Sequence, residues 1–178
     1  SKVIKQIDNQ CDAAIMVWDW KDLSMTRYEE TAEKCQEILC DGWNIKVLPS
    51  LMDRLYCQRK EKLPNETGGV LIGSYDFAHN ICYIVDAIDS PSDSKEYPDA
   101  YIRGSNGLYE KVCKIENITI GNLTYIGEWH SHPADSTFPS ADDMKLLQSI
   151  ADYTFSQSSP GCMMIVGENH YSIYLKSI

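Results

Sequence analysis

The sequence predicts a single domain of the mixed α/β class with an N-terminal extension, on three observations. Segments with helical and with strand-like hydrophobic spacing alternate along the chain, which is typical of folds that combine both elements. The 178 residues suffice for one domain with a core but are few for two. Hydrophobic residues make up 43% of the chain and charged residues 24%, so collagen-like, low-complexity and wholly disordered chains are excluded.

Residues 1–46 form the predicted extension, with one strand and one helix. Residues 13–18 are an apolar, strand-like run. Over residues 26–40 apolar side chains recur at helical spacing, and Asp41-Gly42 follows as a helix stop. The chain begins with Ser1 rather than Met, so we expect a cloning remnant or a fragment of a longer fusion. The extension either packs on the main domain or belongs to an adjoining one.

Residues 47–178 form the predicted main domain, and a strand predicted over 43–48 leads into it. A helix over 49–60 comes next, with Leu51 and Leu55 facing inward. The elements that follow are a hairpin of two β-branched strands at 68–75 and 81–88, a polar loop over 90–99, a strand at 101–103, a helix over 106–118, a strand over 123–129, a helix over 140–155 and a closing hairpin at 162–166 and 171–175.

The charge and the cysteines narrow the class of protein. The 16 basic and 26 acidic residues give a net charge of -10, which repels a phosphate backbone or an anionic membrane surface, so no nucleic-acid and no membrane partner is expected. The longest apolar stretches are shorter than the roughly 18 residues that span a bilayer. Seven cysteines, an odd number spread over core-like positions, favour reduced thiols and a cytoplasmic protein.

Two of the four histidines lie one residue apart, directly after a predicted strand. In an extended segment residues i and i+2 face the same side, so the imidazoles of His130 and His132 can converge. Asp143 lies at the start of the next predicted helix, and its carboxylate can turn back toward them. Two histidines and one aspartate can hold a tetrahedral zinc ion (Zn2+) with the fourth position open for water. Glu66, at the mouth of another apolar strand, is placed to move a proton of that water.

Each of these signals also has a structural interpretation. His-x-His occurs without a metal, and Ser140-x-x-Asp143 is also a helix capping box. Glu66 taken alone is an ordinary solvated loop carboxylate. The three signals in one chain favour the metal site over these separate interpretations.

The same residues resemble a known signature. Glu-Thr-Gly-Gly-x-Leu-x-Gly from Glu66, His-Ser-His-Pro from His130 and Ser-x-x-Asp from Ser140 are similar to the JAMM signature of the MPN (JAB) metalloprotease family, and no motif position is substituted. The resemblance covers about residues 47–178. It implies the MPN (JAB) fold, a mixed curved β-sheet flanked by helices with a cytidine-deaminase-like architecture. A deaminase itself is excluded, because its His-x-Glu and Pro-Cys-x-x-Cys motifs are absent.

The resemblance also assigns a role to each motif residue. It implies that zinc is bound by three side chains, His130, His132 and Asp143. It implies further that Glu66 is the general acid/base and that Ser140 holds the water or stabilises the oxyanion. Asp142 is one residue away from the motif position and is not expected to take part.

Members of this family hydrolyse bonds at the C-terminus of ubiquitin-like proteins. The resemblance therefore implies a zinc-dependent (iso)peptidase that removes a ubiquitin-like protein from a conjugated target or processes its precursor. Glu-Trp-His-Ser-His-Pro at 128–133 is similar to the bacterial branch found beside, or fused to, adenylating ubiquitin-activating-type enzymes. That branch includes enzymes of anti-phage CBASS operons, where the conjugate is a cGAS-like nucleotidyltransferase. Two alternatives stay open, a non-catalytic MPN scaffold and a peptidase that trims a sulfur-carrier protein.

The remaining candidate residues receive structural interpretations. His79 and His170 lie alone in hairpin connections and are expected to face solvent. Trp129 is expected to point away from the ligands into the core, and Cys162 is expected to be core packing. The polar loop over 90–99 is either a plain solvated loop or a segment that contacts substrate.

Overall fold

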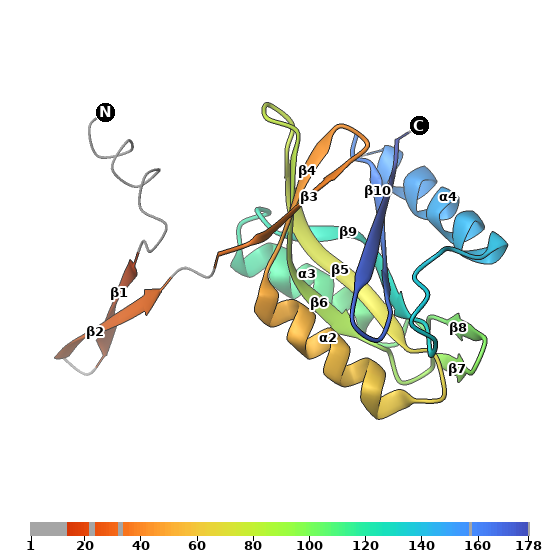
Figure 1. Cartoon of the computed structure of the whole chain (residues 1–178). Helices are drawn as coiled ribbons and strands as arrows, with labels where there is room; N and C mark the ends of the chain where they lie inside the picture. The colour runs from red at the N-terminus through yellow and green to blue at the C-terminus, as the bar shows by residue number, and fades with distance from the viewer. Residues whose placement is uncertain (1–13, 22–23, 32–33, 157, 178) are drawn as a thin grey trace. The chain divides into compact units, whose positions relative to one another are not determined.

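The computed structural model describes residues 14–21, 24–31, 34–156 and 158–177 (Figure 1). The chain divides into two compact units, Ser1–Cys35 and Gln36–Ile178. In the first unit β1 (Ala14–Lys21) and β2 (Ser24–Thr31) pair as an antiparallel hairpin. The second unit carries the sheet, the helices and the motif residues.

A seven-stranded mixed sheet is the body of the second unit. Its strands, in spatial order, are β11 (Tyr171–Lys176), β10 (Gly161–Val166), β9 (Thr124–Ser131), β5 (Gly68–Asp76), β6 (Ile81–Asp89), β4 (Trp43–Val47) and β3 (Gln36–Cys40). The pairs β9–β10 and β4–β6 are parallel, and the other pairs are antiparallel. The sheet is so curved that its two edge strands meet, where the Tyr171 hydroxyl donates to Gln36 Oε1 at 2.6 Å. β5 and β9, which carry motif residues, lie side by side near its centre (Figure 1).

Helices cover both faces of this sheet. α2 (Pro49–Lys62) buries Leu51 and Leu55 against one face. The other face is covered by α3 (Leu108–Ile118), which packs over β5 and β6, and by α4 (Ala141–Phe155), which packs over β10.

Strand alternation sorts the apolar side chains between these two layers. In β5, Val70 and Ile72 belong to the cluster under α3, whereas Leu71 between them belongs to the cluster around α2. In β10, Met163 packs with α4 and Met164 packs on the α2 side. Both faces of the central strands are therefore buried, which explains why their sequences are continuously apolar.

The predicted mixed α/β class, with a curved sheet flanked by helices, is confirmed. So are the helices expected over 49–60, 106–118 and 140–155, the strand over 43–48 and the two hairpins at 68–88 and 162–175. The strand expected over 123–129 continues to Ser131 and so includes His130. The strand-like run at 13–18 lies in β1 apart from Ala13, which is outside the described residues.

The helix predicted over 26–40 is wrong. The structure has β2 and β3 there, with residues 32–33 outside the described part. Asp41 and Gly42 have φ angles of 50° and 80°, so Asp-Gly is the two-residue turn of the β3–β4 hairpin and not a helix stop. Ile38 accordingly packs against the core while its neighbour Leu39 is 82% exposed, as expected for a strand.

The domain boundary predicted after residue 46 stays a prediction. β3 and β4 lie mostly before it, yet they pair into the same sheet as the strands that follow. The division into compact units falls earlier, between Cys35 and Gln36.

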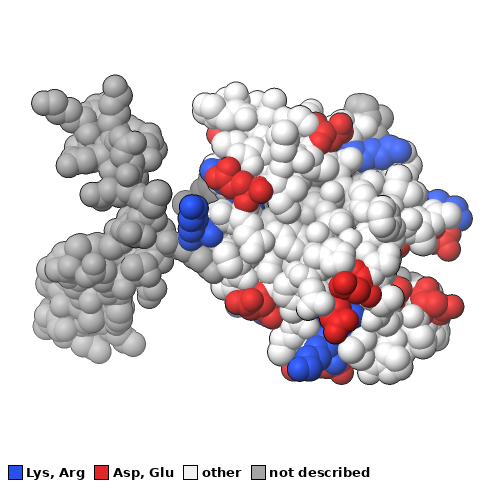
Figure 2. Space-filling model, viewed as in Figure 1, with Lys and Arg blue, Asp and Glu red and all other residues white. Residues whose placement is uncertain are grey.

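Among the described helices, none is long and apolar enough to cross a membrane. On the face shown in Figure 2, acidic and basic side chains lie in small separate groups on a largely uncharged surface. The described residues on that face form no continuous basic patch.

Candidate metal centre

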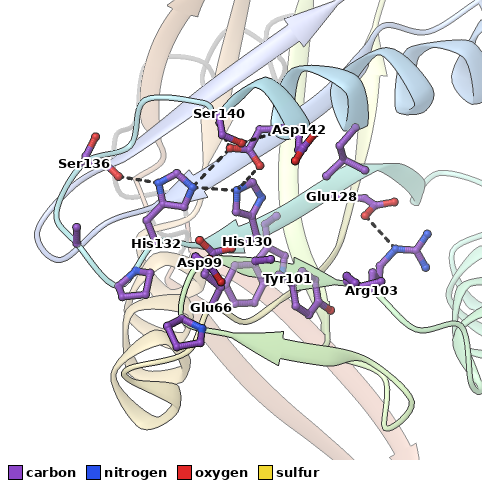
Figure 3. A pocket seen from close by; sticks show the side chains of 18 residues that line it. Glu66, Asp99, Tyr101, Arg103, Glu128, His130, His132, Ser136, Ser140 and Asp142 are labelled. Carbon is purple, nitrogen blue, oxygen red and sulfur yellow. Dashed lines mark hydrogen bonds and ion pairs between the residues drawn. The ribbon is translucent and has the colours of Figure 1, made fainter.

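The motif residues meet at a pocket of about 690 Å³ at one end of the sheet (Figure 3). The pocket is walled by Glu66 just before β5, by the end of β9 and by the start of α4. A further wall is the turn and second strand of a hairpin made of β7 (Lys95–Tyr97) and β8 (Ala100–Ile102). The structure brings together all the predicted site residues, since the pocket is lined by Glu66, His130, His132, Ser140 and Asp143.

β9 places the two histidines. His130 lies within the strand, opposite Gly68 of β5 and Ile165 of β10, and is 3% exposed. His132 lies just beyond the strand end, where its backbone N–H donates to the Val166 carbonyl at 3.0 Å. Their Nε2 atoms are 3.2 Å apart, so the predicted convergence of the i and i+2 imidazoles is confirmed.

The first turn of α4 places Asp143. Ser140 is the N-cap, and its Oγ accepts from the Asp143 N–H at 3.2 Å while the Ser140 N–H donates to Asp143 Oδ2 at 2.7 Å. The other carboxylate oxygen, Oδ1, lies 3.1 Å from His130 Nε2. The capping box is thus present and also aims the carboxylate at the histidines. Asp142 instead is exposed and pairs with Lys145.

The geometry of the three side chains fits a divalent metal ion. His130, His132 and Asp143 each offer one ligand atom, and these atoms lie within 4.8 Å of one another. Two imidazole nitrogens and a carboxylate present lone pairs to one point, and these repel unless a proton or a cation lies between them. Nitrogen and oxygen donors in this combination suit zinc.

Electrostatics keep the carboxylate of this group charged. Burial raises the pKa of Asp143, but hydrogen bonds from His130 and His132 outweigh burial and hold that pKa well below its ordinary value. The same hydrogen bond to Asp143 raises the pKa of His132, against the opposing effect of burial. A fixed negative charge beside two imidazoles favours a cation at their meeting point.

Glu66 lies two residues before β5, beside the imidazoles (Figure 3). Its backbone N–H donates to the Tyr97 carbonyl at 2.8 Å. The next residue is tied to β9, because the Thr67 N–H donates to Ser131 Oγ at 3.1 Å and the Ser131 N–H donates to the Thr67 carbonyl at 2.7 Å. Burial raises the pKa of the Glu66 carboxyl, while the charges of the two imidazoles oppose this rise. A raised pKa makes a carboxylate a stronger base, which suits a group that takes a proton from a neighbouring water.

The two glycines after Glu66 and Thr67 allow the site to form. A Cβ atom on Gly68 would lie 2.3 Å from the Trp129 carbonyl oxygen and 2.5 Å from the Tyr101 ring. A Cβ atom on Gly69 would lie 2.0 Å from the Ile88 carbonyl oxygen. Glycine at position 68 therefore permits the close approach of β5 to β9, and glycine at position 69 permits that of β5 to β6.

Sequence reasoning missed several features of the pocket wall. Residues 95–97, expected to be part of a polar loop, form β7 and pair with β8. Just after β8, Arg103 Nε lies 2.9 Å from Oε2 of Glu128, which is 6% exposed. Glu128 is two residues before His130 and could have been placed on the same face of the strand. Its distant partner carries no sequence signal.

The residues set aside on sequence grounds lie as expected. The His79 and His170 side chains are 73% and 53% exposed, and neither lines the pocket. Trp129 is 1% exposed and Cys162 is fully buried, so both are core residues.

Comparison with known proteins places this geometry in a family. The family described as prokaryotic homologs of the JAB domain matches residues 48–175. A CD-NTase/cGAS isopeptidase of Enterobacter hormaechei subsp. hoffmannii (strain UCI 50) is 34% identical over 125 residues, which are 70% of this chain and 68% of the relative. A second protein of that name, from Escherichia coli (strain TW11681), is 27% identical over 134 residues, covering 70% of this chain and 76% of the relative.

Two solved structures are also similar to this chain. A solution structure of a Desulfitobacterium hafniense protein is 17% identical with a TM-score of 0.49, covering 75% of this chain and 90% of that one. A JAB1/MPN domain protein from Archaeoglobus fulgidus is 21% identical with a TM-score of 0.42, covering 70% of this chain and 83% of that one.

Proposed function

The chain belongs to the family of prokaryotic JAB-domain homologues, and from this premise we propose that it is a zinc-dependent isopeptidase. In this proposal it hydrolyses the bond after the C-terminus of a ubiquitin-like protein, either to release a conjugated target or to process a precursor. The observation that carries the proposal is the convergence of His130, His132 and Asp143 beside Glu66 in one pocket.

The zinc would be held by His130 Nε2, His132 Nε2 and an oxygen of Asp143. Bound zinc supplies an acidified water at neutral pH and polarises the carbonyl under attack. The protein contributes a fixed ligand geometry, because one histidine is held in a strand and the carboxylate by a helix cap.

Glu66 moves the proton. Its carboxylate would take a proton from the attacking water and return it to the nitrogen of the leaving amine, which restores the carboxylate for the next turnover. Burial raises the pKa of Glu66, which makes its carboxylate a stronger base toward the water than an exposed carboxylate would be.

Ser140 can stabilise the developing oxyanion. Its Oγ accepts the Asp143 N–H, so the hydroxyl hydrogen stays available to donate into the pocket, which Ser140 lines. A donor aimed at the place where negative charge develops lowers the barrier.

We propose a substrate from the names of the relatives. Two proteins similar to this chain are CD-NTase/cGAS isopeptidases, which supports a conjugated cGAS-like nucleotidyltransferase as the target. In that setting an adenylating ubiquitin-activating-type enzyme of the same operon would make the conjugate, and the activity would take place in the cytoplasm as part of anti-phage defence.

A substrate panel tests the proposal. The zinc-loaded chain and its Glu66→Gln variant are incubated with three substrates: a ubiquitin-like protein fused through its C-terminus to a reporter, the same ubiquitin-like protein fused through its C-terminus to a cGAS-like nucleotidyltransferase, and a sulfur-carrier protein ending in an added cysteine. Cleavage of either ubiquitin-like fusion by wild type, and not by Glu66→Gln, supports the proposal. Cleavage of the carrier adduct only would favour sulfur-carrier trimming, and zinc binding without any cleavage would favour a scaffold.

A further inference from the structure

Arg59 of α2 is a buried cation outside the sequence motif. It is 5% exposed, although it lies in the last part of a helix whose neighbouring lysines reach the surface. Arginine is rarely buried to this extent unless its guanidinium donates to fixed acceptors, because the charge is costly to remove from water. The groups that accept hydrogen bonds from the Arg59 guanidinium therefore indicate the role of this buried side chain.

The guanidinium of Arg59 binds the backbone that follows the second histidine. Nε donates to the His132 carbonyl at 2.8 Å, and a terminal nitrogen donates to the Pro133 carbonyl at 2.6 Å. Both acceptors are backbone carbonyls, so two consecutive peptide planes are fixed by one planar group.

The two histidines need different support. His130 lies inside β9, and the sheet pairs it with strands on both sides. His132 lies past the strand end, where Val166 holds its N–H but no strand pairing holds its carbonyl. Arg59 donates the hydrogen bond that fixes the His132 carbonyl. The His132 imidazole is held separately, because its Nδ1 donates to the Ser136 carbonyl at 2.8 Å.

We propose that Arg59 is a positioning residue, which fixes the direction in which His132 presents Nε2 and thereby slows the release of a metal ion from the site. This inference rests on the proposed function, because it presumes zinc at these ligands. Outer groups that orient metal-binding histidines typically change metal affinity by 10–100-fold when they are removed.

The test measures the transfer of zinc from the full chain to a coloured chelator, at a temperature where every variant is folded. Arg59→Met keeps the side-chain length and removes both donors, and we expect it to release zinc about 10–100-fold faster. Arg59→Lys keeps the charge with one compact donor group, and we expect an intermediate rate. The matched control is Arg54→Met on the same helix, whose guanidinium binds Asp86 and Asp89 and which should release zinc at the wild-type rate.

A second readout needs no metal. Hydrogen exchange of the metal-free chains is compared over residues 134–138 and over β10, and we expect Arg59→Met to accelerate exchange in the first segment only. Wild-type rates of zinc release and of exchange in Arg59→Met would overturn the inference, and Arg59→Lys carries the same test if Arg59→Met does not fold. A wild-type chain that binds no zinc would contradict the proposed function, while the exchange comparison would still decide the role of Arg59.

Discussion

Asp143 performs two tasks with one carboxylate. Oδ2 accepts the Ser140 N–H and completes the helix cap, and Oδ1 faces His130 Nε2. A side chain that is already fixed by a cap loses little further freedom when it binds a metal. The sequence alone presented the capping box and the metal ligand as alternative roles for Asp143. In the structure its two carboxylate oxygens allow both roles at once.

The first prediction separates the proton carrier from the oxyanion donor. Glu66→Gln should lower turnover by roughly 10²–10⁴-fold, because an amide cannot carry the proton. Ser140→Ala should lower it less, by about 10²–10³-fold, through the loss of one donor. Zinc content should stay at the wild-type level in Glu66→Gln, because Glu66 is not one of the converging ligands.

The matched control for Glu66→Gln is Glu61→Gln, the same chemical change at an exposed position near the end of α2. Its turnover should equal that of wild type. Single-turnover kinetics on a cleaved reporter fusion measure all three variants, and a Glu66→Gln enzyme as fast as Glu61→Gln would exclude Glu66 as the proton carrier.

The convergence of the three proposed ligands could be predicted from sequence because each lies in a short pattern of known geometry. His130 and His132 share a side of an extended segment, and Asp143 starts a helix. Arg59 and Arg103 could not be predicted, because each acts on a segment far away in the sequence. Only the fold brings such pairs together.

At the scale of elements, the close approach of β5 and β9 is what holds Glu66 beside the histidines. Gly68→Ala should therefore destabilise the protein by about 1–3 kcal/mol, the usual cost of overpacking a filled site. The added methyl carbon would lie 2.3 Å from the Trp129 carbonyl oxygen, so the two strands must separate. Urea unfolding measures the change.

The control is Ser74→Ala on the same strand, which adds no atom and should change the free energy of unfolding by less than about 0.5 kcal/mol. Equal stability of the two variants would contradict the steric explanation.

The segment between β8 and α3 gives a pH-dependent prediction. Hydrogen bonds from the Ser105 and Asn106 amides hold the pKa of Asp93 below its ordinary value of 3.8. Because the folded pKa is depressed, the charge of Asp93 contributes stability above pH 3.8, and this contribution is lost as the pH falls through the folded pKa. Asp93→Asn should thus be less stable than wild type at pH 6, and the difference should shrink toward pH 3. Urea unfolding at both pH values checks this, and a difference independent of pH would refute the charge as its cause.

Most elements could be predicted from hydrophobic periodicity, and the failure over 26–40 has a definite cause. Apolar residues spaced three and four apart also occur by chance across two consecutive strands. The Asp41-Gly42 pair was the deciding signal, because residues with positive φ at both positions connect paired strands as readily as they end a helix.

At the scale of the whole molecule, the family resemblance and the compact unit begin at different residues. The family match begins at residue 48, whereas the compact unit begins at Gln36. β4 lies between these two points, pairs with β6 and buries Ile45 completely. We therefore expect residues 36–46 to be needed for folding although they carry no motif residue.

Two truncated chains test this expectation. A chain of residues 36–178 should unfold cooperatively at a temperature close to that of the full chain. A chain of residues 47–178 lacks β3 and nearly all of β4, and the loss of Ile45 alone is worth about 2–5 kcal/mol of a total stability that is typically 5–15 kcal/mol. Thermal unfolding followed by circular dichroism compares them. Equal stability of both chains would make the boundary after residue 46 the better division.

The proposed function depends most directly on whether the pocket holds zinc through the named ligands. Elemental mass spectrometry of the purified full chain, of Asp143→Ala and of the neighbouring control Asp142→Ala measures zinc per chain. We predict close to one zinc in wild type and in Asp142→Ala, and little in Asp143→Ala while circular dichroism shows it folded. Little zinc in wild type after zinc is added, or as much in Asp143→Ala as in wild type, would contradict the metal site.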